Sequence, residues 1–261
     1  MAAADGAFDG ATEALTGTIP VAARGWSAGT RTISVRARDR AGTWSAPVAA
    51  TLTITVPGQL FADGFEAGNL SAWNGGATGA GLAVAAPARL GPTGTYGLAL
   101  AVGNTPAFVT DTTPTAEPSY RARFWFHPNG TGTGGNAWDL FQGASGAQVP
   151  LRVQYRRQGA ATYQVRAQLL AAGGAAVATP WVTISNAPHA VEVAWTAGTG
   201  AGPRLQLFLD GALAQTLSGQ NTGAYRIDTA RLGRVAGPTG GAGGTLYLDQ
   251  FVSSRGAAIG P

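Results

Sequence analysis

Apolar and polar residues alternate in several short stretches near the start of the chain. In the stretch 31–39, Ile33 and Val35 face one way, while threonine, serine and arginine side chains face the other. A period of two is typical of a half-buried β-strand. Two further strands are expected over 13–21 and 50–56, and turn residues separate the three stretches.

The longer second part of the chain contains many short apolar runs separated by glycine- and proline-rich turns. These runs lie at 60–73, 96–103, 119–128, 137–143, 149–170, 180–185, 189–198, 203–217, 225–235 and 244–255. No run shows a convincing period of 3.6 residues, so we expect little helix. About a dozen short strands of this kind predict a two-sheet jelly roll.

Three of these runs also predict local geometry. Apolar residues alternate on both arms of 149–170, which indicates a β-hairpin. Asp210 and Gly211 form a two-residue hairpin turn, because glycine accepts a positive φ. In 119–128 we expect every second side chain to face the core, namely Tyr120, Ala122, Phe124 and Phe126.

Length and composition limit the class of protein. The 261 residues suffice for one large domain or two ordinary ones. Glycine is frequent at 40 residues, but 45% of the chain is apolar, so it is not a disordered polymer. Pro57 and Gly58 form a natural linker. We therefore expect an all-β protein with a first domain over 1–57 and a second over 58–261.

Charge and cysteine content exclude several chemistries. The chain has no cysteine, which removes disulfides, thiolate metal sites and cysteine nucleophiles. The net charge of +4 is modest and does not indicate a nucleic-acid partner. No apolar run approaches the ~20 residues that span a bilayer, so no membrane span is expected.

The first part resembles a known fold family. The segment GTRTISVRARDRAGTWSAPVAATLTITV is similar to the C-terminal half of a bacterial extracellular immunoglobulin-like domain, which typically ends in a VRA-D-AG-WS-PV strand–turn–strand. The resemblance covers about residues 5–56. A complete sandwich of this kind has about seven strands. We expect only three here, so the first half of such a domain is missing and the chain enters it partway, with no visible signal peptide.

A partial sandwich leaves one apolar face to be covered. We predict this face as an assembly surface made of Ile33, Val35, Leu52, Ile54 and Val56. The cover could be the jelly roll of the same chain, an upstream segment of a longer protein, or a neighbouring copy that adds its strands. Repeated head to tail, the last arrangement would give a filament.

The second part resembles the concanavalin A-like lectin/glucanase superfamily in its laminin G-like bacterial form. Three segments carry the resemblance: DGFEAGNLSAW, HAVEVAWTAGTGAGPRLQLFLDGALAQTLSG and YLDQFVSSR. It implies a concanavalin A-like jelly roll. It leaves the activity open, because this fold carries lectins, glycosidases, adhesins and spacers.

The motifs of hydrolases are not found in the sequence. Glycosidases use a pair of carboxylates, and none of the four glutamates has an acidic residue two positions away. Glu192 is alone on its strand and is expected to be a solvated outward residue. There is no G-x-S-x-G and no H-E-x-x-H, and structural roles are expected for His127 and His189. The sequence therefore predicts a protein that is not an enzyme.

Carboxylates in the opening and closing segments of the second part suggest a metal site. In the family that this part resembles, the first and last strands commonly pair, and some members hold a structural Ca²⁺ there. On that basis Asp63, Glu66 and Asp249 are candidate Ca²⁺ ligands. The alternative is that these carboxylates cap turns by accepting backbone N–H groups.

Arginine, glutamine and aromatic residues occupy outward positions of the central strands. If these strands are neighbours, their outward side chains form one face. Such a face suits a sugar ligand, because flat rings stack on sugars while amides and guanidiniums bind hydroxyls or carboxylates. The alternative is an ordinary solvated sheet face. The candidate ligand-binding residues are Arg123, Trp125, Arg152, Gln154, Arg166, Gln168 and Phe208.

Two functions from different classes follow from these patterns. The first is a non-catalytic extracellular or cell-surface module that binds a polysaccharide, a surface glycan or matrix and so serves adhesion. The second is a structural subunit of an extracellular filament or sheath, which assembles with copies of itself by completing the half immunoglobulin-like domain in trans.

Overall fold

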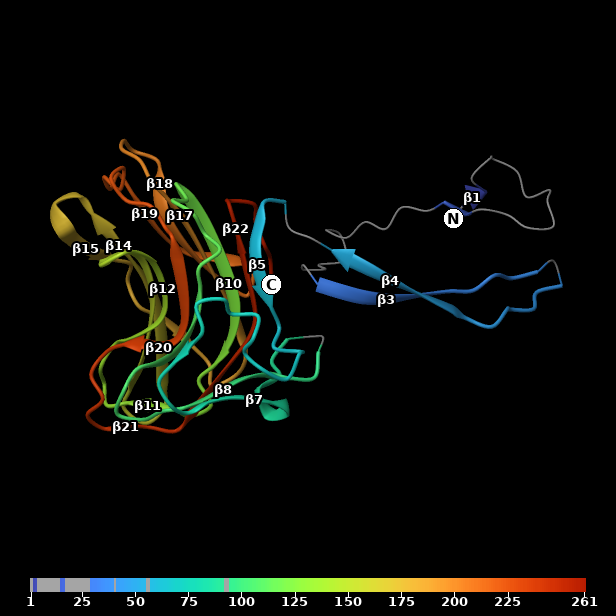
Figure 1. Ribbon diagram of the computed structural model, residues 1–261, viewed down its shortest axis with the longest axis horizontal. Helices are drawn as coiled ribbons and strands as arrows, with labels where there is room; N and C mark the ends of the chain where they lie inside the picture. The colour runs from blue at the N-terminus through green and yellow to red at the C-terminus, as the bar shows by residue number, and fades with distance from the viewer. Residues whose placement is uncertain (1, 4–14, 17–28, 40, 55–56, 92–93) are drawn as a thin grey trace. The chain divides into compact units, whose positions relative to one another are not determined.

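The computed structural model describes residues 2–3, 15–16, 29–39, 41–54, 57–91 and 94–261 (Figure 1). The chain divides into two compact units, Met1–Ile54 and Thr55–Pro261. The division lies close to the predicted linker at Pro57 and Gly58. Each unit is described by itself.

The described part of the first unit consists of two strand pairs. Strand β1 (Ala2–Ala3) pairs with β2 (Leu15–Thr16), and β3 (Gly29–Val35) pairs with β4 (Val48–Ile54), both antiparallel. The strand predicted over 31–39 ends earlier than expected, at Val35, because the chain then turns through a bridge between Arg38 and Trp44.

The register of β3 and β4 sets the predicted assembly surface. Ile33 lies opposite Ala50 and Val35 opposite Val48, and the same face carries Leu52 and Ile54. Ile33, Val35, Leu52 and Ile54 are all half-buried. Val56 lies outside the described residues. The immunoglobulin-like identity of this unit and its completion in trans stay predictions.

The second unit is a sandwich of two eight-stranded antiparallel sheets. Sheet I has the order β19-β18-β17-β10-β22-β8-β7, with β5 also paired to β22. Its strands are β5 (Gln59–Asp63), β7 (Leu82–Ala85), β8 (Gly97–Ala101), β10 (Ser119–His127), β17 (His189–Thr196), β18 (Pro203–Leu209), β19 (Ala212–Ser218) and β22 (Thr245–Ser254).

Sheet II has the order β15-β14-β13-β12-β20-β9-β6, with β16 also paired to β14. Its strands are β6 (Ala77–Thr78), β9 (Ala107–Asp111), β12 (Trp138–Ser145), β13 (Gln148–Gln158), β14 (Thr162–Ala171), β15 (Ala175–Ala178), β16 (Val182–Ile184) and β20 (Thr229–Ala236). The small pair β11 (Gly132–Thr133) and β21 (Ala242–Gly243) joins two loops, and single 3₁₀ turns lie at η2 (Ala86–Ala88) and η3 (Ala172–Gly174).

This architecture confirms the all-β, two-sheet prediction, with more strands than expected. Figure 1 shows the two layers facing one another, with β12 and β14 in one and β10, β17 and β22 in the other. The predicted hairpin over 149–170 is formed by β13 and β14, with Tyr155 opposite Val165. The predicted turn at Asp210 and Gly211 joins β18 to β19, and both residues have positive φ values of 51° and 82°.

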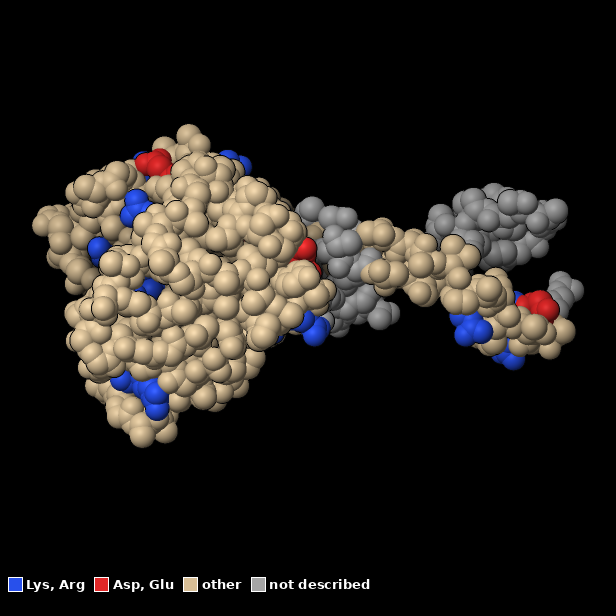
Figure 2. Space-filling model, turned by 60° about the horizontal axis from the view of Figure 1, so that its bottom comes forward, with Lys and Arg blue, Asp and Glu red and all other residues tan. Residues whose placement is uncertain are grey.

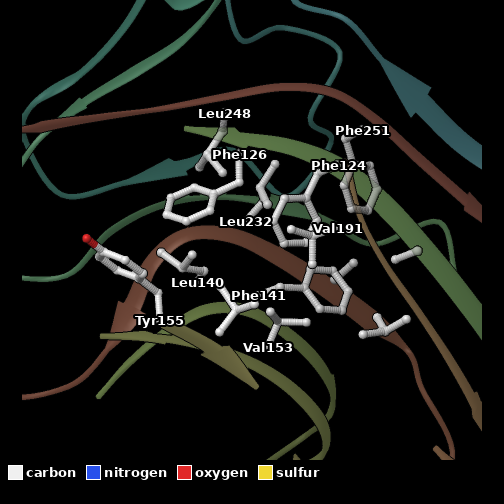
Figure 3. Close-up of a cluster of buried hydrophobic side chains, with 14 of the residues drawn as sticks. Phe124, Phe126, Leu140, Phe141, Val153, Tyr155, Val191, Leu232, Leu248 and Phe251 are labelled. Atoms are coloured by element: carbon white, nitrogen blue, oxygen red, sulfur yellow. The ribbon is translucent and has the colours of Figure 1, made fainter. Parts of the chain in front are cut away.

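The core lies between the two sheets. On β10, every second side chain is fully buried (Tyr120, Ala122, Phe124 and Phe126), as the alternation predicts. In Figure 3 the side chains of sheet I meet those of sheet II; the labelled residues are Phe124, Phe126, Val191, Leu248 and Phe251 from sheet I and Leu140, Phe141, Val153, Tyr155 and Leu232 from sheet II. Because the inward positions fill this core, the polar residues between them must lie on the outer faces of the sheets.

Two further features concern helix length and surface charge. Among the described residues, no helix is long and apolar enough to cross a membrane. In the face shown in Figure 2, charged side chains are few and scattered over a largely uncharged surface.

Candidate binding face

The outer face of sheet II carries a ladder of arginine and glutamine side chains on β13 and β14. The register places Arg and Gln directly opposite one another in three successive outward pairs, Arg152 with Gln168, Gln154 with Arg166, and Arg156 with Gln164. All six side chains are half-buried, whereas the residues between them are buried in the core. Cross-strand neighbours on one face are close enough to bond.

Hydrogen bonds fix two rungs of this ladder. Arg156 Nε donates to Gln164 Oε1 at 2.9 Å, and Arg166 Nε donates to Gln154 Oε1 at 2.8 Å. Planar side chains held in this way lose less conformational entropy when they bind a ligand, because their geometry is already set.

One carboxylate anchors the ladder from β12. Asp139 Oδ1 accepts a hydrogen bond from Gln154 Nε2 at 2.7 Å, and Asp139 Oδ2 accepts one from Gln142 Nε2 at 2.7 Å. Arg152 Nε lies 3.1 Å from the same Oδ2. Asp139 is buried at 7% exposure, so its charge is balanced by these donors rather than by bulk water. The side-chain hydrogen bonds from Arg166 to Gln154 and from Gln154 to Asp139 thus link β14, β13 and β12.

An indole ring lies beside the ladder. Trp181 immediately precedes β16, which pairs with β14, and its ring centroid is 4.2 Å from the guanidinium carbon of Arg156 and 4.4 Å from that of Arg166. A guanidinium this close to an indole ring is attracted by the ring quadrupole. Burial and the neighbouring charge of Arg156 lower the pKa of Arg166 from its ordinary value, while Asp139 opposes that shift.

The composition of this face determines what it can bind. Three guanidiniums, Arg152, Arg156 and Arg166, stand against one carboxylate, Asp139, so the face carries an excess of positive charge. Guanidiniums bind carboxylates in a bidentate way, amides bind hydroxyls, and the indole offers an apolar ring edge and face. We call this set of residues, with Gln142, Gln154, Gln164, Gln168 and Trp181, the ladder face.

The structure divides the predicted ligand-binding residues between two surfaces. Arg152, Gln154, Arg166 and Gln168 come together on the ladder face. Arg123, Trp125 and Phe208 lie on β10 and β18, which belong to sheet I. The predicted single face is therefore formed only in part: β13 and β14 are neighbours in sheet II, whereas β10 and β18 belong to the other sheet.

The outer face of sheet I is covered around Glu192 and Arg123. Glu192 lies opposite Arg123, pairs with Arg121 at 2.8 Å, and accepts the backbone N–H groups of Ile259 and Gly260 at 3.3 and 3.0 Å. The prediction that Glu192 is a solvated residue is wrong, because C-terminal residues lie over it and leave it 5% exposed.

Arg123 is the most enclosed of the predicted ligand-binding residues. It has 0% exposure, and burial lowers its pKa to about 10, while the charges of Glu192 and Asp249 oppose that shift. Trp125 is half-buried, and Phe208 lies 4.9 Å from the guanidinium carbon of Arg121. A ligand on this surface would not reach the side chain of Arg123.

Sequence reasoning missed several residues of the ladder face. Arg156 is not among them, because its outward position follows from the alternation of Arg152 and Gln154. Trp181 follows a proline at the start of a short strand, and Asp139 lies in an apolar run. Nothing local to Trp181 or Asp139 indicates that they meet β13 and β14.

The carboxylates predicted as calcium ligands all accept N–H groups. Asp63 bonds Phe65 N–H at 2.9 Å and the Trp73 indole N–H at 2.8 Å, and Glu66 bonds the backbone of Thr95 with both oxygens. Asp249 accepts the backbone N–H groups of Leu90, Gly91 and Gln250.

These contacts correspond to the turn-capping alternative. No group of three or more metal-binding side chains is found in the described part of the chain. The first and last strands of the jelly roll, β5 and β22, do pair as expected. Calcium stays a prediction, and a chelator that lowers the melting temperature would support it.

Comparisons with known proteins find similar folds among solved structures. No family model matches the chain, and no curated protein matches it. Among solved structures, the chain is similar to the cellulose-induced protein Cip1, with a TM-score of 0.50 and 14% identity over 77% of this chain and 99% of that one. It is also similar to a carbohydrate esterase from the Shiga toxin-encoding bacteriophage phi24B, with a TM-score of 0.51 and 14% identity over 75% and 98%.

A third similar structure is the receptor-binding domain of a botulinum neurotoxin of mosaic serotype C/D. Its TM-score is 0.53 at 11% identity, over 77% of this chain and 49% of the toxin domain. The chain thus spans about half the length of that domain. At these identities the likeness concerns the fold, and it agrees with a jelly-roll β-sandwich.

Proposed function

We propose that the chain is a glycan-binding module and that the ladder face is its binding surface. The observation that carries the proposal is the indole of Trp181, whose ring centroid lies within 4.4 Å of the guanidinium carbons of Arg156 and Arg166, beside planar groups held by Asp139. This is the combination that sugars require, a ring for stacking and fixed donors for hydroxyl and carboxylate oxygens.

The charge of the ladder face favours acidic polysaccharides. Three arginines against one carboxylate attract uronate groups, and each guanidinium can hold a carboxylate with two hydrogen bonds. Support from the comparisons is limited to fold, and one structure of similar fold is named a carbohydrate esterase. An extracellular or cell-surface location and a role in adhesion are part of the proposal.

The ladder face is proposed to bind glycosidic chains without cleaving them. Glycosidases need two carboxyl groups, one of which protonates the leaving oxygen. Asp139 is committed to Gln142, Gln154 and Arg152 and has no second carboxylate among its described contacts. It therefore serves as an anchor.

Affinity electrophoresis in gels containing polysaccharide tests the proposal. The chain should be retarded by polygalacturonate, less so by neutral xylan, and less in both gels as salt rises, because charge pairs are screened. Arg166→Gln should abolish most of the retardation. The control is Arg226→Gln, an exposed arginine bonded to backbone carbonyls away from this face.

The results that would contradict the proposal are equally specific. The ladder face is not the site if Arg166→Gln and Arg226→Gln behave alike. Glycan binding itself is refuted if no acidic or neutral polysaccharide retards the unaltered chain.

A further inference from the structure

Three polar side chains outside the ladder face form a hydrogen-bonded series. Ser185 Oγ lies 2.8 Å from Nε2 of His189, and Nδ1 of the same ring lies 2.8 Å from Oδ2 of Asp210. The serine and the carboxylate thus occupy opposite nitrogens of one imidazole. This is the arrangement by which serine hydrolases activate a hydroxyl group, and it is recognised by geometry rather than by sequence order.

The fold brings these residues together from distant parts of the chain. Ser185 follows β16 in sheet II, and His189 opens β17 in sheet I, so the chain crosses between sheets over these few residues. Asp210 lies in the turn between β18 and β19. Its N–H donates to Ala190 O at 2.8 Å, and its Oδ1 accepts Ala190 N–H at 2.8 Å. Asp210 is therefore fixed to the strand that carries His189.

The contacts also set the proton positions. A carboxylate can only accept, so Nδ1 of a neutral His189 carries the proton that faces Asp210. Nε2 is then the acceptor for the hydroxyl of Ser185, which is the role of a general base. Ser185 is exposed, and the side chain of His189 is 15% exposed, so a substrate can approach the hydroxyl.

The loop that carries Ser185 is held by its own contacts. Asn186 Oδ1 accepts Gly130 N–H at 2.8 Å, and Asn186 O lies 3.2 Å from Nε2 of His127. Both contacts tie this loop to the end of β10. A nucleophile held in this way keeps its distance from its base.

We propose that Ser185, His189 and Asp210 form a catalytic site that hydrolyses carboxylic esters. Ser185 Oγ attacks the ester carbonyl as its proton passes to His189 Nε2. The resulting oxyanion collapses, the bond to the alcohol oxygen breaks, and His189 returns the proton to the leaving alcohol. A water molecule then attacks the acyl-serine by the same route, releasing the carboxylic acid and restoring Ser185. Asp210 is a positioning residue.

The substrate class that we infer is the O-acylated glycan, and this part rests on the proposed function. Alternation along β16 places Trp181, Thr183 and Ser185 on the same side of the strand, and Thr183 Oγ1 accepts a bond from Gln164 of the ladder face at 3.4 Å. Four residues of extended chain span about 13 Å. A polysaccharide on the ladder face therefore extends past Ser185, where an acyl group on a sugar hydroxyl meets the nucleophile.

The first experiment measures hydrolysis of p-nitrophenyl acetate by the whole chain. Ser185→Ala should lower kcat/KM by at least ~100-fold. Ser218→Ala, which changes an exposed serine of β19, should leave it unchanged. The proposal is overturned if the unaltered chain is no faster than buffer, or if the two variants have equal rates.

A second readout is needed because an imidazole alone can cleave an activated ester. A fluorophosphonate probe should form one covalent adduct, which mass spectrometry locates in the tryptic peptide 167–204. Ser185 is the single serine of that peptide. Labelling should be lost in Ser185→Ala and retained in Ser218→Ala. An adduct found elsewhere, or none, contradicts the proposal.

The variant Asp210→Asn distinguishes a role of Asp210 in orienting His189 from a role in the folding of the turn. Asparagine followed by glycine suits the same two-residue turn, so the turn between β18 and β19 should persist. The amide still accepts Ala190 N–H through its oxygen but presents N–H to His189, which disfavours the required tautomer. We expect kcat to fall by ~100-fold or more with KM unchanged, and Asp210→Glu to recover part of the loss. A change in KM alone would argue against the assigned role.

The substrate class is tested with acetylated pectin, which carries both uronate and acetyl groups. Acetate release should be lost in Ser185→Ala, reduced by Trp181→Ala and retained in Ser218→Ala. If the small ester is cleaved and pectin is not, the substrate class is wrong while the site stands. If pectin is bound by the chain but no ester is cleaved, the site is wrong while the proposed function stands.

Discussion

The outer faces of the two sheets use similar residues and differ in how far their arginine side chains are enclosed. On sheet II, Asp139 anchors arginine and glutamine side chains that stay half-open to solvent. On sheet I, Glu192 and Asp249 flank Arg123, which has 0% exposure. The difference comes from the C-terminal residues Ile259 and Gly260, whose N–H groups bond Glu192. The same alternating pattern can therefore make either a half-open polar surface or a buried polar layer.

The largest predicted effect compares one arginine from each face. Arg121→Ala should reduce the free energy of unfolding by about 3–5 kcal/mol, because it leaves the buried Glu192 without the cation that pairs with it at 2.8 Å. Arg156→Ala, whose half-buried guanidinium bonds Gln164 rather than a carboxylate, should cost about 1 kcal/mol. Chemical denaturation of both variants measures the difference, and equal losses would show that the two faces are not distinct in burial.

A second prediction concerns the pH dependence of stability on the covered face. Burial raises the pKa of Asp249 to about 6, above its ordinary 3.8, so the folded chain holds this proton more tightly than the unfolded chain. The stabilisation is present below pH 4 and is lost as the pH rises through 6, a change of roughly 3 kcal/mol.

Unfolding free energies at several pH values, for the unaltered chain and for Asp249→Asn, test this point. The fall between pH 4 and 6 should be smaller in the variant. Asp63 and Asp111, whose pKa values are also raised mainly by burial, contribute a slope of the same sign to both proteins. A variant with the unaltered slope would mean that Asp249 is not enclosed as described.

A third stability prediction concerns the C-terminal residues that cover Glu192. Ile259 is 6% exposed, and Ile259→Ala should lower the free energy of unfolding by about 2 kcal/mol through lost burial and a cavity. Retardation by polygalacturonate should be unaffected. If instead binding is lost, the covered face takes part in ligand recognition and the comparison fails.

Much of the fold could be predicted because it depends on local alternation. The core positions of β10, the hairpin of β13 and β14, and the turn at Asp210 and Gly211 all follow from residue patterns within one or two strands. Arg123 and Arg152 have the same local pattern, so nothing nearby in sequence shows that one belongs to sheet I. Strand order is set by pairing between distant segments, such as β10 with β17 and β22.

The candidate sites could likewise be predicted only where they depend on residues close together in the sequence. Arg152 and Gln154 could be proposed from alternation, whereas Trp181 joins them only because β16 pairs with β14. Ser185, His189 and Asp210 appear in the sequence as separate turn and strand residues. Their meeting depends on where the chain crosses between the sheets, which no short motif records.

The central claim, that the ladder face binds glycans and the outer face of sheet I does not, is tested most directly with two tryptophans. Isothermal titration with polygalacturonate fragments should show affinity reduced by at least ~10-fold in Trp181→Ala, about 1.4 kcal/mol. Trp125→Ala, which removes a half-buried indole from β10, should bind like the unaltered chain. Loss of binding in Trp125→Ala with full binding in Trp181→Ala would contradict the account.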